Sequence, residues 1–197
     1  MPGPLKKGWY SRGYLPHFDG ENKVQFVTFR VYDSLPVNVV QRMQDEVRIM
    51  PESVHKQEAR KRAEVWLDRG YGSCWLRNPV VAEILTQELW QLDGEDYMLL
   101  GWCIMPNHVH VVCELSDQRE MWKVIKRWKA ISAQQINKIL NRTGAVWYRE
   151  YFDRFIRTDV HLQSTLEYVH QNPVRAKLGR QAEKWRFSSA WRPTEEE

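Results

Sequence analysis

One short run near the middle of the chain constrains the fold most. It reads Met105-Pro106-Asn107-His108-Val109-His110-Val111-Val112-Cys113. Because side chains alternate between the two faces of a strand, His108 and His110 share one face, and Val109 and Val111 share the other. We expect the valine face of the strand to be buried against a hydrophobic core. The other face presents two neighbouring imidazoles, which can hold a divalent cation together or bind one polar group each.

The segments around this run predict an antiparallel sheet. Residues 97–105 are almost continuously apolar and lead into the turn signal Pro106-Asn107, so they should form a hairpin with the histidine strand. Residues 24–32 and 147–157 are rich in strand formers. Helical patterns occupy 36–92 in two or three pieces, 119–141 and 158–171, with start signals at Asp33 to Pro36, Asn78-Pro79 and Thr158-Asp159.

This order of elements predicts an α+β fold. It is the ferredoxin-like arrangement, an antiparallel sheet with helices on one face, with a helical insertion after the first strand. The length of 197 residues suits one domain. Within it we expect an N-terminal arm at 1–22, the helical insertion at 36–92 and a C-terminal tail at 174–197.

Composition narrows the class of protein. The formal net charge of +4 permits a polyanionic partner without requiring one. The three cysteines have no Cys-x-x-Cys spacing, which favours a reduced, cytoplasmic protein. No apolar run approaches the ~20 residues of a membrane span, and no secretory signal is recognisable, so we expect no membrane association.

The last predicted helix carries side chains that could meet the two histidines. Its apolar stripe is Leu162, Leu166 and Val169, and Tyr168 lies off that stripe. Asn172 follows on the same face as Tyr168. A deprotonated phenol can attack a phosphodiester, and a carboxamide oxygen suits Mg²⁺ or Mn²⁺. We therefore expect Tyr168 and Asn172 to lie near the histidines.

Several motifs resemble those of a known family. The histidine run follows Met-Pro-Asn, and residues 168–173 read Tyr-x-x-x-Asn-Pro. Further matching segments are 12–17, 26–30, 33–36, 128–130, 151–157 and 167–176. With these motifs the chain resembles the HUH single-stranded DNA endonucleases, and in particular the REP-associated tyrosine transposases, which are IS200-like one-tyrosine transposases.

The resemblance implies a fold and an activity. His108 and His110 would hold Mg²⁺ or Mn²⁺, with Asn172 completing the metal site, and Tyr168 would be the nucleophile. The rival tyrosines, Tyr148 and Tyr151, lie outside the Tyr-x-x-x-Asn-Pro motif that carries the nucleophile in that family. The enzyme would nick single-stranded DNA that carries a hairpin, form a 5′-phosphotyrosine and transfer strands, working in the cytoplasm on nucleoid DNA as a monomer or homodimer.

Cations and aromatic residues elsewhere are candidate DNA contacts. They are Arg12, Tyr14, Lys123, Lys126, Arg127 and Arg154. Two other functions remain open at this point. One is a non-catalytic regulator that binds hairpin DNA on the same fold. The other is a metal hydrolase that uses an activated water and leaves Tyr168 without a role.

Overall fold

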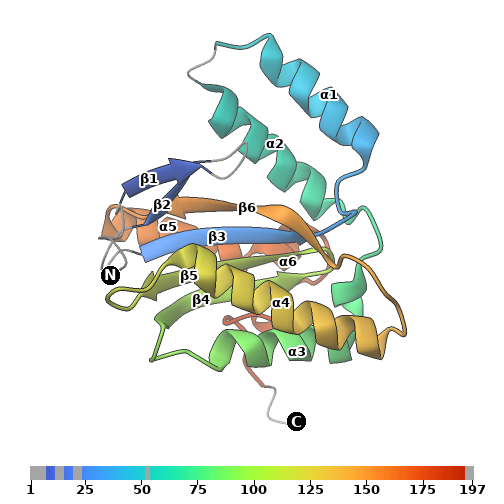
Figure 1. Ribbon diagram of the computed structural model, residues 1–197, viewed down its shortest axis with the longest axis vertical. Coiled ribbons are helices and arrows are strands. Elements are labelled where there is room, and N and C mark those ends of the chain that lie inside the picture. Colours follow the sequence, from blue (N-terminus) through green and yellow to red (C-terminus); the bar gives the residue numbers. More distant parts are fainter. Residues whose placement is uncertain (1–7, 12–15, 20–23, 52–53, 194–197) are drawn as a thin grey trace, which may run out of the picture.

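The structure, a computed structural model, describes residues 8–11, 16–19, 24–51 and 54–193. Its centre is an antiparallel sheet with the strand order β4-β5-β3-β6 (Figure 1). These strands are β3 (Val24–Val31), β4 (Tyr97–Met105), β5 (His108–Leu115) and β6 (Trp147–Phe155). A separate hairpin pairs β1 (Gly8–Ser11) with β2 (Pro16–Asp19). The histidine strand β5 is therefore central and forms a hairpin with β4, as predicted.

The register of the sheet decides which side chains accompany the histidines. Thr28 of β3 lies opposite His110, and Arg30 lies opposite His108. On the other side of β3, Thr28 lies opposite Phe152 of β6. Since directly opposed residues share a face, polar and aromatic side chains of β3 and β6 extend the histidine face across the sheet.

Two helices cover the valine face of the sheet. They are α3 (Pro79–Trp90) and α4 (Met121–Ile139), and a short 3-10 helix, η2 (Trp75–Arg77), precedes α3. Asn78 caps α3 as predicted, because its Oδ1 accepts a hydrogen bond from Val80 N at 3.0 Å. Val109 and Val111 are fully buried in the main core that these helices form with the sheet.

Two further helices cover the histidine face: α5 (Asp159–His170) and α6 (Asn172–Arg175). The predicted Thr158 cap is present, since Thr158 Oγ1 accepts from His161 N at 3.1 Å. Gly101 allows α5 to approach β4 closely, because a Cβ at that position would lie 2.5 Å from Leu166 Cδ2. The predicted α+β class with an antiparallel sheet is confirmed, but helices cover both faces of the sheet instead of one, and the last long helix lies on the side of the histidines.

Two helices within the predicted 36–92 segment form a separate layer next to the sheet, and Phe152 of β6 packs against their core. They are α1 (Val37–Arg48) and α2 (His55–Asp68), which lie at the top of Figure 1 and pack on each other in a small core of their own. The predicted cap at Asp33-Ser34 is wrong, since α1 begins without a side-chain cap. Asp33 Oδ2 instead accepts from the backbone N and the hydroxyl of Ser73 at 3.0 and 2.6 Å.

The C-terminal segment protects the outer edge of β4. Ile104 N donates to Phe187 O at 2.8 Å, and Ser189 N donates to Trp102 O at 2.9 Å. A short 3-10 helix, η3 (Ala182–Lys184), precedes this pairing. An edge strand that is paired in this way no longer offers free backbone groups to another chain. Among the described residues, no helix has both the length and the apolar composition that crossing a bilayer would require.

Candidate active site

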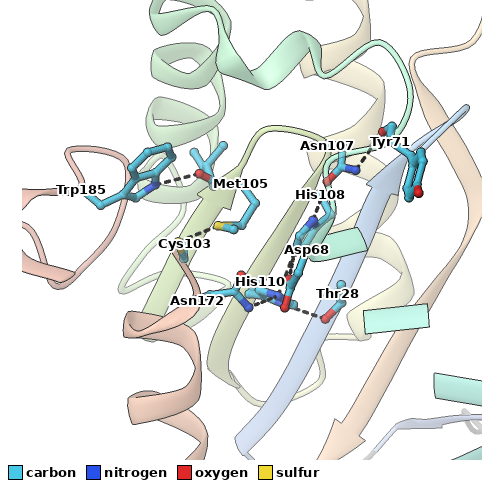
Figure 2. A network of polar contacts seen from close by, with 11 residues as sticks. Thr28, Asp68, Tyr71, Cys103, Met105, Asn107, His108, His110, Asn172 and Trp185 are labelled. Carbon is cyan, nitrogen blue, oxygen red and sulfur yellow. Dashed lines mark hydrogen bonds and ion pairs between the residues drawn. The ribbon is translucent and has the colours of Figure 1, made fainter. Parts of the chain in front are cut away.

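The two histidines lie side by side in the interior. His108 and His110 are each 1% exposed, and their Nε2 atoms are 3.0 Å apart (Figure 2). The sequence predicts helices on one face of the sheet, but α5 and α6 also cover the face that carries the histidines. The side chain of Asp68, at the end of α2, is 22% exposed and lies next to His108. The cluster is therefore exposed to solvent on the side of Asp68.

Hydrogen bonds fix the orientation of the His108 ring. Asn107 Nδ2 donates to Tyr71 O at 2.9 Å, so Asn107 Oδ1 is the atom that faces His108 Nδ1, at 2.8 Å. Because that oxygen can only accept, His108 carries its proton on Nδ1 and a lone pair on Nε2. Burial lowers the pKa of His108 to about 3, so the ring is neutral at physiological pH.

Hydrogen bonds also fix the orientation and the tautomer of the His110 ring. Its Nδ1 lies 2.8 Å from Thr28 Oγ1, and its Nε2 accepts a hydrogen bond from Asn172 Nδ2 at 3.1 Å. The proton of His110 therefore belongs on Nδ1, facing the threonine hydroxyl. Both Nε2 lone pairs then point into the same small space, which favours a cation there.

Asp68 completes the cluster. Its Oδ1 lies 3.7 Å from His108 Nε2, and one ligand atom from each of Asp68, His108 and His110 lies within 4.8 Å of the others. Oδ1 is buried and accepts no hydrogen bond from the residues that the structure describes. Two imidazole nitrogens with one carboxylate oxygen form a donor set that suits a divalent cation such as Mn²⁺.

The charges around Asp68 also favour a cation. Burial raises the pKa of Asp68 to about 6; the positive charge of Arg175 opposes this rise, the negative charge of Glu64 adds to it, and a hydrogen bond from Asn172 opposes it. A bound cation would remove the cost of burying this carboxylate.

Asn172 stands directly beside the cluster. It is fully buried at the start of α6, and its Oδ1 is a buried acceptor without a partner among the described residues. A half-turn of the amide would exchange Nδ2 and Oδ1 and turn the oxygen toward the ring nitrogens. The structure thus brings the three predicted metal ligands, His108, His110 and Asn172, together. Their role as ligands stays a prediction.

Tyr168 lies over the same cluster from the last turn of α5. Its ring centroid is 5.5 Å from that of His110 and 5.9 Å from that of Phe26. The guanidinium of Arg175 lies 4.0 Å from the centre of the tyrosine ring. Burial is the main cause that raises the pKa of Tyr168, the charges of Glu64 and Asp68 add to it, and Arg175 opposes it. The phenol therefore needs an acceptor for its proton before it can act as a nucleophile.

The two rival tyrosines do not reach the cluster. Tyr151 is buried in the core on the valine face, behind the sheet. Tyr148 stacks on Arg30, with 3.6 Å between the guanidinium carbon and the ring centre. Tyr168 is thus the tyrosine that the structure brings to His110.

The predicted DNA contacts are scattered. Arg154 reaches the histidine face, where its Nη2 donates to Thr165 Oγ1 of α5 at 3.2 Å. The cations of α4, Lys123, Lys126 and Arg127, lie on the helix that covers the opposite face of the sheet. Arg12 and Tyr14 lie outside the described residues. Of the four candidates that the structure describes, only Arg154 lies on the histidine face, and DNA binding by each of the six stays a prediction.

Asp68 is the residue that the sequence did not reveal. It ends a helix whose preceding turns are rich in charged residues, a pattern typical of a solvated surface. Its only distinguishing signal is its position directly after Leu67, which is 1% exposed. The contact with His108 joins segments far apart in the chain, so no local pattern could have predicted it.

Part of the chain matches a known protein family. Residues 77–172 match the family model described as "Transposase IS200 like". The match includes both histidines, Tyr168 and Asn172. The predicted resemblance to the IS200-like transposases is confirmed. Helices α1 and α2, and with them Asp68, lie outside the part of the chain that matches the IS200-like model.

One curated relative is similar to part of the chain. The chain is 26% identical over 105 residues to a candidate REP-associated tyrosine transposase of Haemophilus influenzae. This match covers 48% of the present chain and 60% of that relative, less than two thirds of its length.

Comparison with solved structures shows a similar fold. A REP-associated tyrosine transposase bound to a REP hairpin aligns with a TM-score of 0.54 and 14% identity, over 91% of the present chain and 81% of that one. A candidate transposase from Deinococcus radiodurans R1 aligns at 14% identity over 83% and 96% of the two chains, but its TM-score of 0.34 supports no conclusion.

Proposed function

We propose that this protein is a metal-dependent, single-strand-specific DNA endonuclease and strand transferase in which Tyr168 is the nucleophile. The observation that best supports this proposal is that the candidate metal ligands and the candidate nucleophile lie close together. The Nε2 lone pairs of His108 and His110, the buried Oδ1 of Asp68 and the ring of Tyr168 all lie around one space. A regulator that only binds DNA would have no use for this arrangement.

The metal would be held by His108, His110 and Asp68, with the Asn172 oxygen as a further ligand after rotation of its amide. A bound Mg²⁺ or Mn²⁺ would supply Lewis-acid polarisation of the scissile phosphate. Thr28 and Asn107 keep the two imidazoles in the tautomer that leaves both Nε2 atoms free to coordinate.

Tyr168 would carry the covalent step. Its hydroxyl oxygen forms a bond to phosphorus, and the bond between phosphorus and the 3′ oxygen breaks. The phenolic proton passes to a carboxylate, for which Glu64 of α2 is the candidate because its charge acts on Tyr168. The leaving 3′ oxygen takes up a proton from water to become a hydroxyl. Arg175, over the tyrosine ring, stabilises the negative charge as the phenol ionises.

The products would be a 5′-phosphotyrosine and a free 3′-hydroxyl. Because the phosphotyrosine conserves the energy of the phosphodiester, attack by another 3′-hydroxyl joins strands without ATP. We infer a hairpin-containing DNA substrate, since the neighbour of the same fold was solved on a REP hairpin. We expect such a protein to act in the cytoplasm, on nucleoid DNA.

A covalent adduct tests this proposal. The protein is incubated with single-stranded oligonucleotides that carry a hairpin, with Mn²⁺ or with EDTA, and resolved on a denaturing gel. We expect an adduct with Mn²⁺ that is absent with EDTA and absent in Tyr168→Phe, although that variant still binds the DNA. Cleavage without an adduct would indicate an activated water instead, and binding without cleavage would indicate a regulator.

A further inference from the structure

A second cavity adjoins the proposed active site. It has a volume of about 440 Å³ and lies between the pair of helices α1 and α2 and the histidine face of β3 and β6. Its floor includes Arg30, Tyr148 and Phe152, and its apolar wall includes Val40, Met43 and Ala59. Cavities of this size accept small organic groups. We call it the α1–α2 cleft.

The floor of the α1–α2 cleft contains a buried cation stacked on an aromatic ring. Arg30 is 6% exposed, donates to Ser34 Oγ at 3.1 Å and lies 3.6 Å from the centre of the Tyr148 ring. Neither of these described partners is an acid. A guanidinium held flat against an aromatic ring offers donor N–H groups at its edge and a platform for stacking.

The charges of the α1–α2 cleft favour a neutral group inside and an anion at the rim. Arg30 and Glu150 both line the cleft and carry opposite charges, and Glu150 Oε1 also lies 3.8 Å from Arg149 Nε. Arg48 also lines the cleft and is exposed to solvent. A nucleotide has this distribution, because its base is flat and neutral and its phosphate is anionic.

The α1–α2 cleft is connected to the metal cluster in two ways. Thr28 lines the cleft and contacts His110 Nδ1 at 2.8 Å. Helix α2 contributes Ala59 and Ala63 to the wall and ends at Asp68. By the rise of an α-helix, Ala63 precedes Asp68 by about 7.5 Å along the axis. A nucleotide next to the phosphate at the cluster would therefore have its base near the cleft.

We propose that the α1–α2 cleft binds one unpaired base of the DNA strand, adjacent to the phosphate that Tyr168 attacks. This proposal rests on the proposed function and adds a substrate subsite to it. Arg30 and Tyr148 hold the base by stacking and hydrogen bonding, and Arg48 neutralises its phosphate. The α1 and α2 helices thereby have two roles, since they supply both a metal ligand and a base-binding wall.

Two variants of α2 test this proposal. Ala59→Phe fills the α1–α2 cleft, whereas Val65→Phe adds the same ring on the same helix at a position that is 54% exposed and outside the cleft lining. Binding is measured by fluorescence anisotropy in EDTA, with a hairpin carrying a single-stranded extension that contains all four bases. We expect Ala59→Phe to weaken binding by about 5- to 150-fold, the range for loss of one stacked base, and Val65→Phe to bind like the wild type.

A series of DNAs with one abasic site at each position of the extension locates the base. We expect one position to weaken binding to the wild type and to have no further effect on Ala59→Phe. Tyr148→Leu should lose the same position-specific sensitivity. Equal binding by Ala59→Phe and the wild type, or equal losses in the two phenylalanine variants, would overturn the proposal.

As controls, manganese binding and thermal unfolding of each variant are compared with those of the wild type. Unchanged values show that Asp68 and the fold are undisturbed. The two proposals can fail separately. A position-specific abasic effect without any covalent adduct would support the cleft and contradict the nuclease. Adduct formation without an abasic effect would support the nuclease and contradict the base-binding role of the cleft.

Discussion

Replacing Asp68 by Asn should have opposite effects on stability with and without metal. Burial raises the pKa of this carboxyl from 3.8 to about 6. At about 1.36 kcal/mol per pKa unit, carrying this charge costs the metal-free protein about 3 kcal/mol at neutral pH. Asn has the same shape without the charge, and its amide can donate to an imidazole nitrogen. We therefore expect Asp68→Asn to be more stable than the wild type in EDTA, by about 1 to 3 kcal/mol.

The pH dependence of this effect has a definite sign. Because the folded state binds the Asp68 proton more tightly than the unfolded state, the wild type loses stability as pH rises from about 4 to about 6. Above about pH 6 the wild type carries the full cost of the buried charge. Below about pH 4 the charge of Asp68 should cause no difference in the free energy of unfolding between the wild type and Asp68→Asn.

Mn²⁺ should reverse the comparison. A ligand at 100 times its Kd stabilises a protein by about 2.7 kcal/mol, and the variant lacks the anionic ligand that would bring this gain. The assay is thermal and urea unfolding of both proteins, at pH 4 and pH 7.5, with EDTA or Mn²⁺. A variant that is less stable than the wild type in EDTA at pH 7.5, or that gains as much from Mn²⁺, would refute the assignment of Asp68.

Two further substitutions test the support around the site. Gly101→Val should push Leu166 and α5 away from β4 and cost about 1 to 3 kcal/mol of stability. Adduct formation through Tyr168 should fall by more than Mn²⁺ binding does. Equal losses of adduct formation and Mn²⁺ binding would contradict this prediction. Lys129 donates to the carbonyls of residues 148–150, and burial lowers its pKa to about 8. Since the unfolded state binds this proton more tightly, the wild type should gain stability as pH rises from about 8 to about 10. In urea unfolding, Lys129→Met should be less stable by about 1 to 3 kcal/mol and lack that gain.

Features with a local cause could be predicted from the sequence. The hairpin of β4 and β5 follows from two apolar runs around a turn signal, and Asn78 and Thr158 cap their helices as their positions indicate. Tyr168 and Asn172 also arrive at the histidine face, because helical spacing puts them on one side of the same chain segment.

Features that depend on tertiary contact could not be predicted. The burial of both histidines was not predicted, and it arises because α5 and α6 pack on their face of the sheet. A helix start with a capping residue was expected at 33–36; α1 does begin there, but without a side-chain cap, and Asp33 instead accepts hydrogen bonds from the distant Ser73. Asp68 joins the cluster only through the placement of α2, and no periodicity in the sequence records where that helix docks.

Mapping the covalent adduct tests the central claim most directly. The protein is trapped on a hairpin DNA with a single-stranded extension in the presence of Mn²⁺, digested with nuclease and protease, and analysed by mass spectrometry. The account predicts a nucleotide attached through a 5′-phosphate to Tyr168, and a sharp loss of this peptide in Asp68→Asn. A nucleotide on Tyr148 or Tyr151, or cleaved DNA with no modified peptide, would contradict it.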